Sequence, residues 1–230
     1  MGDSIVYTEL EHYSTPPGLY TRALPFVEQE SCNSINGRLA ELAGYVEDFA
    51  AALELYEVST KAVGHLMVPF DGTEDETRAR NIKRRWRFIA AKDGAMTIYH
   101  FGETIDAVRG GLGNCKTLRA MVNTDKLKEA DKHFDKAFPN YVKLRHSVAH
   151  QAIVAKAPYM AMSRSDGTGQ TIITGTLIDR RFISVWNGHR VEYEISEPSL
   201  SELATIRGEI FDAFTEASGR LKAAPTDTGQ

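Results

Sequence analysis

The chain has 230 residues, of which 42% are hydrophobic and 25% are charged, as in an ordinary globular protein with one large domain or an added subdomain. The net charge of −4 argues against a protein that coats nucleic acid non-specifically, because that binding needs many Lys and Arg contacts to phosphates, but it is compatible with a local basic patch. The acidic start at residues 1–4 has no apolar signal core, and no apolar stretch is long enough to span a bilayer. We therefore expect a cytoplasmic protein with no membrane partner.

The two cysteines, Cys32 and Cys115, are far apart and form no CxxC pair. This spacing argues against a disulfide framework and a structural zinc site, and it favours reduced thiols.

The N-terminal part of the chain predicts an irregular lead-in followed by a long helix. Residues 1–30 contain three prolines and a glycine between positions 16 and 25, which favours irregular structure. A helix is expected to begin near Ser31 or Ser34, since these side chains can cap free N–H groups. Apolar residues then recur at a spacing of three or four, which is typical of an amphipathic helix. They are Leu39, Leu42, Val46, Phe49, Leu53 and Tyr56.

A second long helix is predicted from Thr73, with Glu76 three residues later as a capping box. The glycines within residues 110–113 end it. Shorter helices are expected over residues 124–138 and after Pro139, which suits a first helical turn. Together these helices make a predicted bundle over residues 31–155.

Residues 156–197 have a different pattern that predicts an inserted β-hairpin or small sheet. Residues 171–178 are rich in β-branched side chains, and further strands are expected at 182–186 and 190–195. The Asn-Gly pair at 187–188 between these last two runs is a strong signal for a hairpin turn.

The C-terminal part predicts one more helix, over residues 198–222, that packs on the bundle, and a flexible tail over 223–230. The predicted fold class is therefore mainly α: a helical bundle with a small antiparallel sheet inserted before the last helix.

Residues 144–150 place one arginine and two histidines in a helix that otherwise has a buried pattern. Arg and His are poor core residues, and a buried charge is costly unless it is paired. His146 and His150 are four residues apart and share a helix face. Arg145 and His150 are separated by about 140° around the helix and about 7.5 Å along it, a distance that a long Arg side chain can span.

A polar set on the second long helix could supply partners for this run. Its spacings of four, three and four residues predict one narrow stripe. The members are Asp93, Thr97, His100 and Thr104. We expect Asp93 to form an ion pair with Arg145, and His100 or the neighbouring Tyr99 to orient His150.

These residues suggest a phosphodiester site. Arg145 would bind a phosphate through its forked donors, and His150 would act as a general base on an adjacent hydroxyl. No metal is needed if that hydroxyl is the ribose 2′-OH. The alternative is a satisfied structural network, in which Arg145 pairs with Asp93 and the histidines bind backbone carbonyls.

An arginine, a polar residue, three more residues and a histidine on a late bundle helix resemble the signature of the HEPN superfamily. Here the matching residues are Arg145, His146 and His150, and the resemblance covers roughly residues 31–155 plus the last helix. It implies a metal-independent endoribonuclease without a cofactor, acting as a homodimer whose two motifs face each other. Toxin and defence roles in the family imply RNA or an antitoxin-like protein as partner, although many members are inactive and only bind nucleic acid or nucleotides. The hairpin at 171–195 is an addition to the pattern.

Two further sites are compatible with the sequence. His146 and His150 could share a zinc ion, with a third ligand from His100, Asp93 or His133, but no Glu follows the first His as in metalloproteases. The second is a basic stretch around Trp86 that could contact RNA, or could be a solvated helix face weakened by the acidic residues 74–76. Its candidate contacts are Lys83, Arg84, Arg85 and Arg87.

The sequence thus leaves two functional hypotheses: a HEPN-like endoribonuclease, or a non-catalytic binding or assembly module in which the Arg/His motif is structural.

Overall fold

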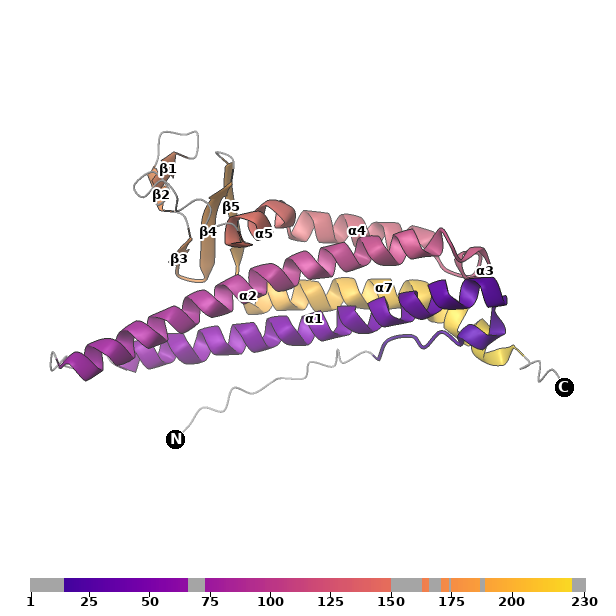
Figure 1. Cartoon of the computed structure of the whole chain (residues 1–230), viewed down its shortest axis with the longest axis horizontal. Helices are drawn as coiled ribbons and strands as arrows, with labels where there is room; N and C mark the ends of the chain where they lie inside the picture. Colours follow the sequence, from indigo (N-terminus) through magenta and orange to yellow (C-terminus); the bar gives the residue numbers. More distant parts are fainter. Residues whose placement is uncertain are drawn as a thin grey trace. The chain divides into compact units, whose positions relative to one another are not determined.

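A computed structural model describes residues 15–65, 73–149, 163–165, 171–173, 175–186 and 189–224. The protein is mainly helical, with a small antiparallel sheet before the final helix, as predicted (Figure 1). The helical elements are η1 (Thr21–Ala23), α1 (Phe26–His65), α2 (Glu74–Leu112), α3 (Lys116–Arg119), α4 (Thr124–Ala137), α5 (Tyr141–Ala149) and α7 (Glu197–Ala223). The strands are β1 (Ser163–Ser165), β2 (Thr171–Ile173), β3 (Thr176–Ile178), β4 (Arg181–Trp186) and β5 (His189–Glu194).

Helix α1 begins at Phe26, earlier than the predicted start near Ser31. The carbonyl of Pro25 accepts a hydrogen bond from the backbone N–H of Glu28 at 2.8 Å, so the proline stands at the helix start. Proline is tolerated there because its missing N–H would have no partner in the first turn. The irregular lead-in is therefore shorter than its prolines suggest.

Helix α2 begins and ends where the sequence predicts. The Thr73 hydroxyl accepts a hydrogen bond from the backbone N–H of Glu76 at 3.3 Å, which is half of the predicted capping box. The helix ends at Leu112, within the glycine run. The short helix α3 has no counterpart among the predicted elements.

The single strand predicted at residues 171–178 is instead two short strands, β2 and β3, which belong to two separate sheets. Strand β2 pairs with β1, whereas β3 pairs with β4. Gly175 lies between β2 and β3 with a φ of 72°, in the left-handed region that glycine adopts without strain. The predicted hairpin is present as the antiparallel pair β4–β5, in which Trp186 is opposite His189. The Asn-Gly turn itself lies outside the described residues.

The chain divides into two compact units. Unit 1 comprises residues 1–44, 103–134 and 202–230, and unit 2 comprises residues 45–102 and 135–201. Helices α1, α2, α4 and α7 contribute residues to both units, and the sheets belong to unit 2. Within the described part of the chain, no helix combines the length and the hydropathy needed to cross a membrane.

The core of unit 1 is helical. Its fully buried side chains include Leu39, Ile105, Leu118, Phe134, Ile206 and Phe214. The Glu28 carboxylate accepts hydrogen bonds from the backbone N–H of Thr117 at 3.0 Å and from its hydroxyl at 3.2 Å, and so caps α3.

Both cysteines are free thiols buried in unit 1. Burial raises the pKa of the Cys32 thiol to about 12, and burial together with the Glu28 carboxylate raises the pKa of Cys115. A thiol must lose its proton to act as a nucleophile or metal ligand. Neither cysteine is therefore suited to thiolate chemistry.

His133 of α4 is bound between two glutamates of α7. Its Nδ1 lies 3.0 Å from a Glu209 oxygen, and its Nε2 lies 2.9 Å from a Glu202 oxygen. The hydrogen bond to Glu209, with further help from Glu202, raises the pKa of the imidazole above its usual 6.5. In its protonated form the imidazolium ties α4 to α7 through both glutamates.

Because the pKa of His133 is raised by folding, its stabilising contribution is complete below the unfolded value and is lost as the pH rises through the folded value. The side chain is 32% exposed, so we expect protonated His133 to contribute up to about 1 kcal/mol to the free energy of unfolding. This contribution is measured by urea unfolding of the wild type and of His133→Gln at about pH 6 and about pH 9. The variant should lose less stability between the two pH values, and an equal loss in both proteins would contradict the proposed charge.

In unit 2 the sheet β3-β4-β5 packs on α5 and on α2 (Figure 1). The Tyr193 hydroxyl on β5 donates a hydrogen bond to the carbonyl of Ala91 on α2. Gly94, one turn later, leaves room for this contact, since a Cβ there would lie 2.7 Å from the Tyr193 oxygen. The buried residues include Phe49, Ile98, Phe101, Leu144, Phe182 and Ile195.

Candidate functional site

The Arg/His motif is carried by α5, a nine-residue helix in unit 2. The helix follows Asn140, a residue that tolerates the left-handed conformation it adopts here, with a φ of 66°. Leu144 and Ser147 are buried and anchor one face of the helix. Arg145 and His146 are half-buried, so the motif lies at the edge of the core and not inside it.

Arg145 lies over the ring of Tyr99, a residue of α2. The guanidinium carbon is 5.3 Å from the ring centroid, which is a cation–π distance. The Nη1 atom is 3.3 Å from Nδ1 of His146, and the buried Nε has no hydrogen-bond partner among the described residues.

The predicted ion pair between Asp93 and Arg145 is absent: among the described residues, no carboxylate lies within ion-pair distance of Arg145. The helix geometry explains the error. Asp93 and Tyr99 are six residues apart on α2, so their side chains point in directions about 120° apart. Arg145 packs on the face that carries Tyr99 and not on the face that carries Asp93. Burial raises the pKa of the Asp93 carboxyl, and the neighbouring Asp48 raises it further.

The other members of the predicted polar stripe also have different roles. Thr97 and Thr104 are buried, and the Thr97 hydroxyl donates a hydrogen bond to the backbone carbonyl of Asp93 at 3.0 Å. His100 is exposed and stacks on Tyr45, with ring centroids 6.0 Å apart. It meets Tyr99 edge-on at 5.3 Å.

Flat rings surround the motif. His146 stacks on Trp186 of β4, with ring centroids 5.2 Å apart and an interplanar angle of 18°. Tyr141, one turn before Arg145 on α5, lies beside Tyr99, with ring centroids 6.3 Å apart. We call this group the ring cluster; it consists of Tyr45, Tyr99, His100, Tyr141, Arg145, His146 and Trp186. Sequence reasoning missed Tyr45, Tyr141 and Trp186. Only Tyr141 had a local signal, its spacing of four residues from Arg145.

His150 lies outside the described residues, so its predicted orientation by Tyr99 or His100 stays a prediction. The zinc alternative also depends on His150 and stays a prediction. His133 is held by glutamates in unit 1, and among the residues that the structure describes, no three His, Cys, Asp or Glu side chains come together to hold a metal.

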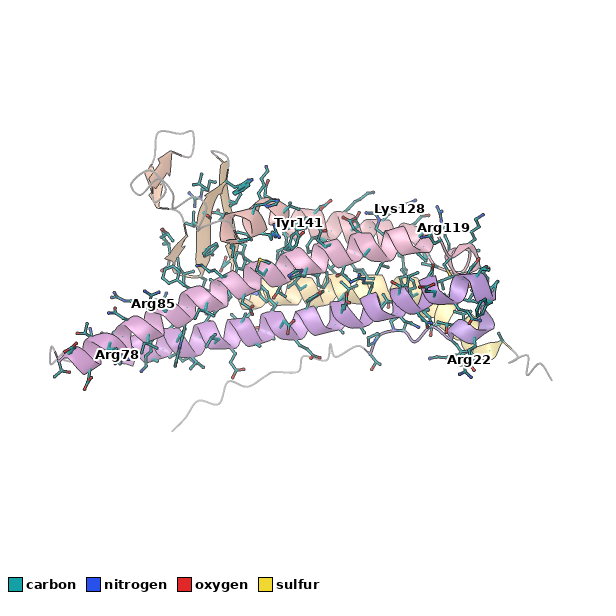
Figure 2. The ribbon with its side chains drawn as sticks, in the orientation of Figure 1. Arg22, Arg78, Arg85, Arg119, Lys128 and Tyr141 are labelled. Carbon is teal, nitrogen blue, oxygen red and sulfur yellow. The ribbon has the colours of Figure 1, made fainter. Side chains whose placement is uncertain are left out.

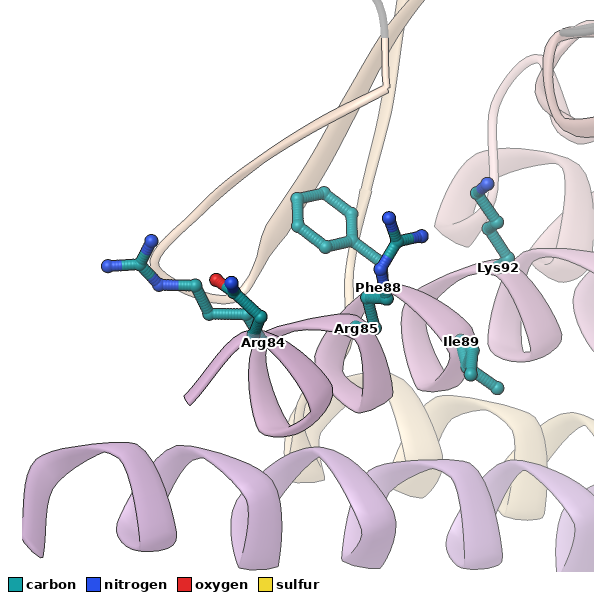
Figure 3. Close-up of a pocket in the computed structure, with 6 residues that line it drawn as sticks. Arg84, Arg85, Phe88, Ile89 and Lys92 are labelled. Atoms are coloured by element: carbon teal, nitrogen blue, oxygen red, sulfur yellow. The ribbon is translucent and has the colours of Figure 1, made fainter. Parts of the chain in front are cut away.

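The basic stretch of α2 also lies in unit 2, and its four candidate residues separate into two groups. Arg84 and Arg85 are exposed and line an open groove with Phe88, as Figure 3 shows. Arg87 instead packs on Tyr56, donating a hydrogen bond of 3.3 Å to the Tyr56 hydroxyl. Lys83 is half-buried and does not line the groove.

The ring cluster therefore offers a half-exposed guanidinium that no described carboxylate neutralises, beside several partly exposed rings. A guanidinium of this kind can bind phosphate, and flat rings can stack on bases. Comparisons of the chain with models of known protein families, with curated proteins and with solved structures give no match.

Proposed function

We propose that this chain is a HEPN-like RNA-binding protein, and a metal-independent endoribonuclease, whose helix α5 binds RNA phosphate through Arg145. The observation that carries the proposal is the environment of Arg145: its guanidinium lies on Tyr99 without a carboxylate partner among the described residues. Had Asp93 neutralised Arg145, a purely structural role would have been favoured.

The chemistry follows from the residues of the motif. Arg145 holds the scissile phosphate and balances the charge that develops on its oxygens. His150 takes the proton from the ribose 2′-OH, whose oxygen then forms a bond to phosphorus while the bond to the 5′ oxygen breaks. The leaving 5′ oxygen takes up a proton, so that in sum one proton moves from the 2′ oxygen to the 5′ oxygen. The products are a 2′,3′-cyclic phosphate and a 5′-hydroxyl, and no water or metal is consumed.

The proposal includes a cytoplasmic homodimer, with RNA as substrate and an antitoxin-like protein as regulator. The homodimer, the RNA substrate and the antitoxin-like regulator come from the family resemblance of Arg145, His146 and His150. The cytoplasmic location comes from the two separate cysteines, whose spacing favours reduced thiols.

RNA binding tests the role of Arg145 directly. RNA with 2′-O-methyl riboses is used because it cannot be cleaved by attack of its own 2′-OH. Losing the charge-assisted contacts in Arg145→Ala should weaken binding about 10- to 100-fold. The RNA affinity of Arg145→Lys should lie between those of the wild type and Arg145→Ala, since lysine keeps the charge but loses the planar fork of the guanidinium. Fluorescence anisotropy of a labelled oligonucleotide measures the affinities.

Lys143→Ala is the matched control, because Lys143 is an exposed cation of the same helix, with its ammonium bonded to Asn140 at 2.9 Å. This variant should bind RNA almost as the wild type does. Equal weakening by both variants would show that only net charge matters, and unchanged binding by Arg145→Ala would refute the proposal.

The stack of His146 on Trp186 favours a second candidate, a non-catalytic assembly module. This contact joins α5 to β4, which is a structural use of one motif residue. In that case Arg145→Ala should lower the melting temperature clearly and leave RNA binding at the level of the Lys143→Ala control. Thermal unfolding of the same variants decides between the two functions.

A further inference from the structure

We propose that the N-terminal half of α2 is a second RNA contact, which binds the single strand next to the phosphate held by Arg145. This inference rests on the proposed function and names its substrate: an unpaired RNA strand that is longer than the α5 site alone can hold.

The first observation is a set of cations without carboxylate partners. Among the described residues, no ion pair involves the following four side chains. They are Arg78, Arg84, Arg85 and Lys92. Arg80, in contrast, pairs with Glu76 at 3.2 Å. We call the four cations the α2 track; a positive groove of this kind attracts a phosphate backbone.

The second observation is that large apolar side chains lie between these cations. Arg84, Arg85 and Lys92 line an open groove together with Phe88 and Ile89, which are 36% and 54% exposed. In Figure 3 the side chains of Arg85, Phe88 and Lys92 rise from the same side of α2. Cations that alternate with an exposed ring suit a single strand, whose phosphates and unstacked bases are both accessible.

The third observation is the alignment of the track with the ring cluster. Arg78, Arg85, Lys92 and Tyr99 are each seven residues apart, and each step of seven residues returns to the same helix face within about 20°. Over the three steps the row therefore turns slowly around α2 by about 60°. Arg78 and Arg85 are labelled on α2 in Figure 2. The row is about 31 Å long at 1.5 Å per residue, and it ends at the ring on which Arg145 lies.

This arrangement favours a single strand over a duplex. In a duplex the bases are paired and stacked on each other, so Phe88 would have no base face to contact. A strand whose phosphate is held at Arg145 can continue toward Lys92 and Arg85, with its backbone on the cations.

Binding of a short and a long oligonucleotide separates the two contacts. Both are 2′-O-methyl RNA, of about 4 and about 16 nucleotides, which spans the usual size of single-strand sites. The track variant carries Arg84→Gln, Arg85→Gln and Lys92→Gln. The matched control carries Arg22→Gln, Lys116→Gln and Arg119→Gln, which removes three exposed cations of unit 1. Figure 2 labels Arg22 and Arg119 of this control.

We expect the track variant to bind the long strand about tenfold more weakly and the short strand as the wild type does. Its slope of log affinity against log salt for the long strand should be smaller by about 2, since each lost contact to a single strand contributes about 0.7. The control variant should have the affinities and the salt slope of the wild type.

The outcomes distinguish the two proposals. If Arg145→Ala weakens binding of both strands but the track variant matches its control, the α2 track is refuted and the α5 site stands. If a duplex of the same length binds more tightly than the long single strand, the single-strand assignment is wrong. If the wild type binds neither strand, both proposals fail.

Discussion

His150→Ala is expected to lower the rate of RNA cleavage in EDTA by about 10²- to 10⁴-fold, which is the usual contribution of a general base. The physical reason is that the 2′-OH cannot attack the phosphate efficiently unless a group removes its proton. RNA affinity should stay close to that of the wild type, because Arg145 and the rings remain. Single-turnover cleavage of a labelled RNA measures the rate, and anisotropy measures the affinity.

Two features of the cleavage reaction test this prediction further. The wild-type rate should rise with pH as the imidazole loses its proton and becomes a base, and the residual rate of His150→Ala should lack that step. Products should end in a 2′,3′-cyclic phosphate. Equal cleavage by both proteins, or none by the wild type across varied RNAs, would rule out the enzyme and leave a binding module.

Gly94→Ala is expected to destabilise the protein by about 1–3 kcal/mol, although alanine is normally the better helix residue. The added Cβ would lie 2.7 Å from the Tyr193 oxygen and 3.3 Å from an edge carbon of Phe49. Tyr193 cannot retreat without losing its hydrogen bond to the carbonyl of Ala91. Urea unfolding measures the change in the free energy of unfolding.

Gly44→Ala is the control for this substitution, since Gly44 is also inside a long helix but a Cβ added there would meet no described atom within 4 Å. It should stabilise the protein by up to about 1 kcal/mol, through the smaller entropy of the unfolded chain. If both variants were stabilised, the close contact of α2 with Tyr193 would be wrong.

Much of the fold could be predicted from local sequence signals. The cap at Thr73, the glycine run around Leu112 and the Asn-Gly pair between β4 and β5 each act on neighbouring residues, and the elements begin and end accordingly. The start of α1 could not be placed because Pro25 is compatible with both a loop and a first helical turn. The break at Gly175 escapes a local reading because the β-branched residues on both sides favour strand.

The site could be predicted less well, because its partners come from distant segments. The motif itself is visible in the sequence, but the contact of Arg145 with Tyr99 depends on which face of α2 meets α5. Opposite charge alone points to Asp93 as the partner of Arg145, but Asp93 lies on a different face of that helix. Trp186 reaches His146 only through the packing of β4 on α5, and no spacing along the chain reports such packing.

Both tryptophans of the chain, Trp86 and Trp186, belong to unit 2, so unit 1 contributes nothing to tryptophan emission. Tryptophan fluorescence, excited at a wavelength that tyrosine does not absorb, therefore follows the unfolding of unit 2 alone, whereas far-ultraviolet circular dichroism follows the helices of both units. Coincident denaturation curves from the two signals would mean a single cooperative transition, and separate midpoints would give each unit a stability of its own. The uneven distribution of one residue type thus makes the cooperativity of the protein measurable without any label.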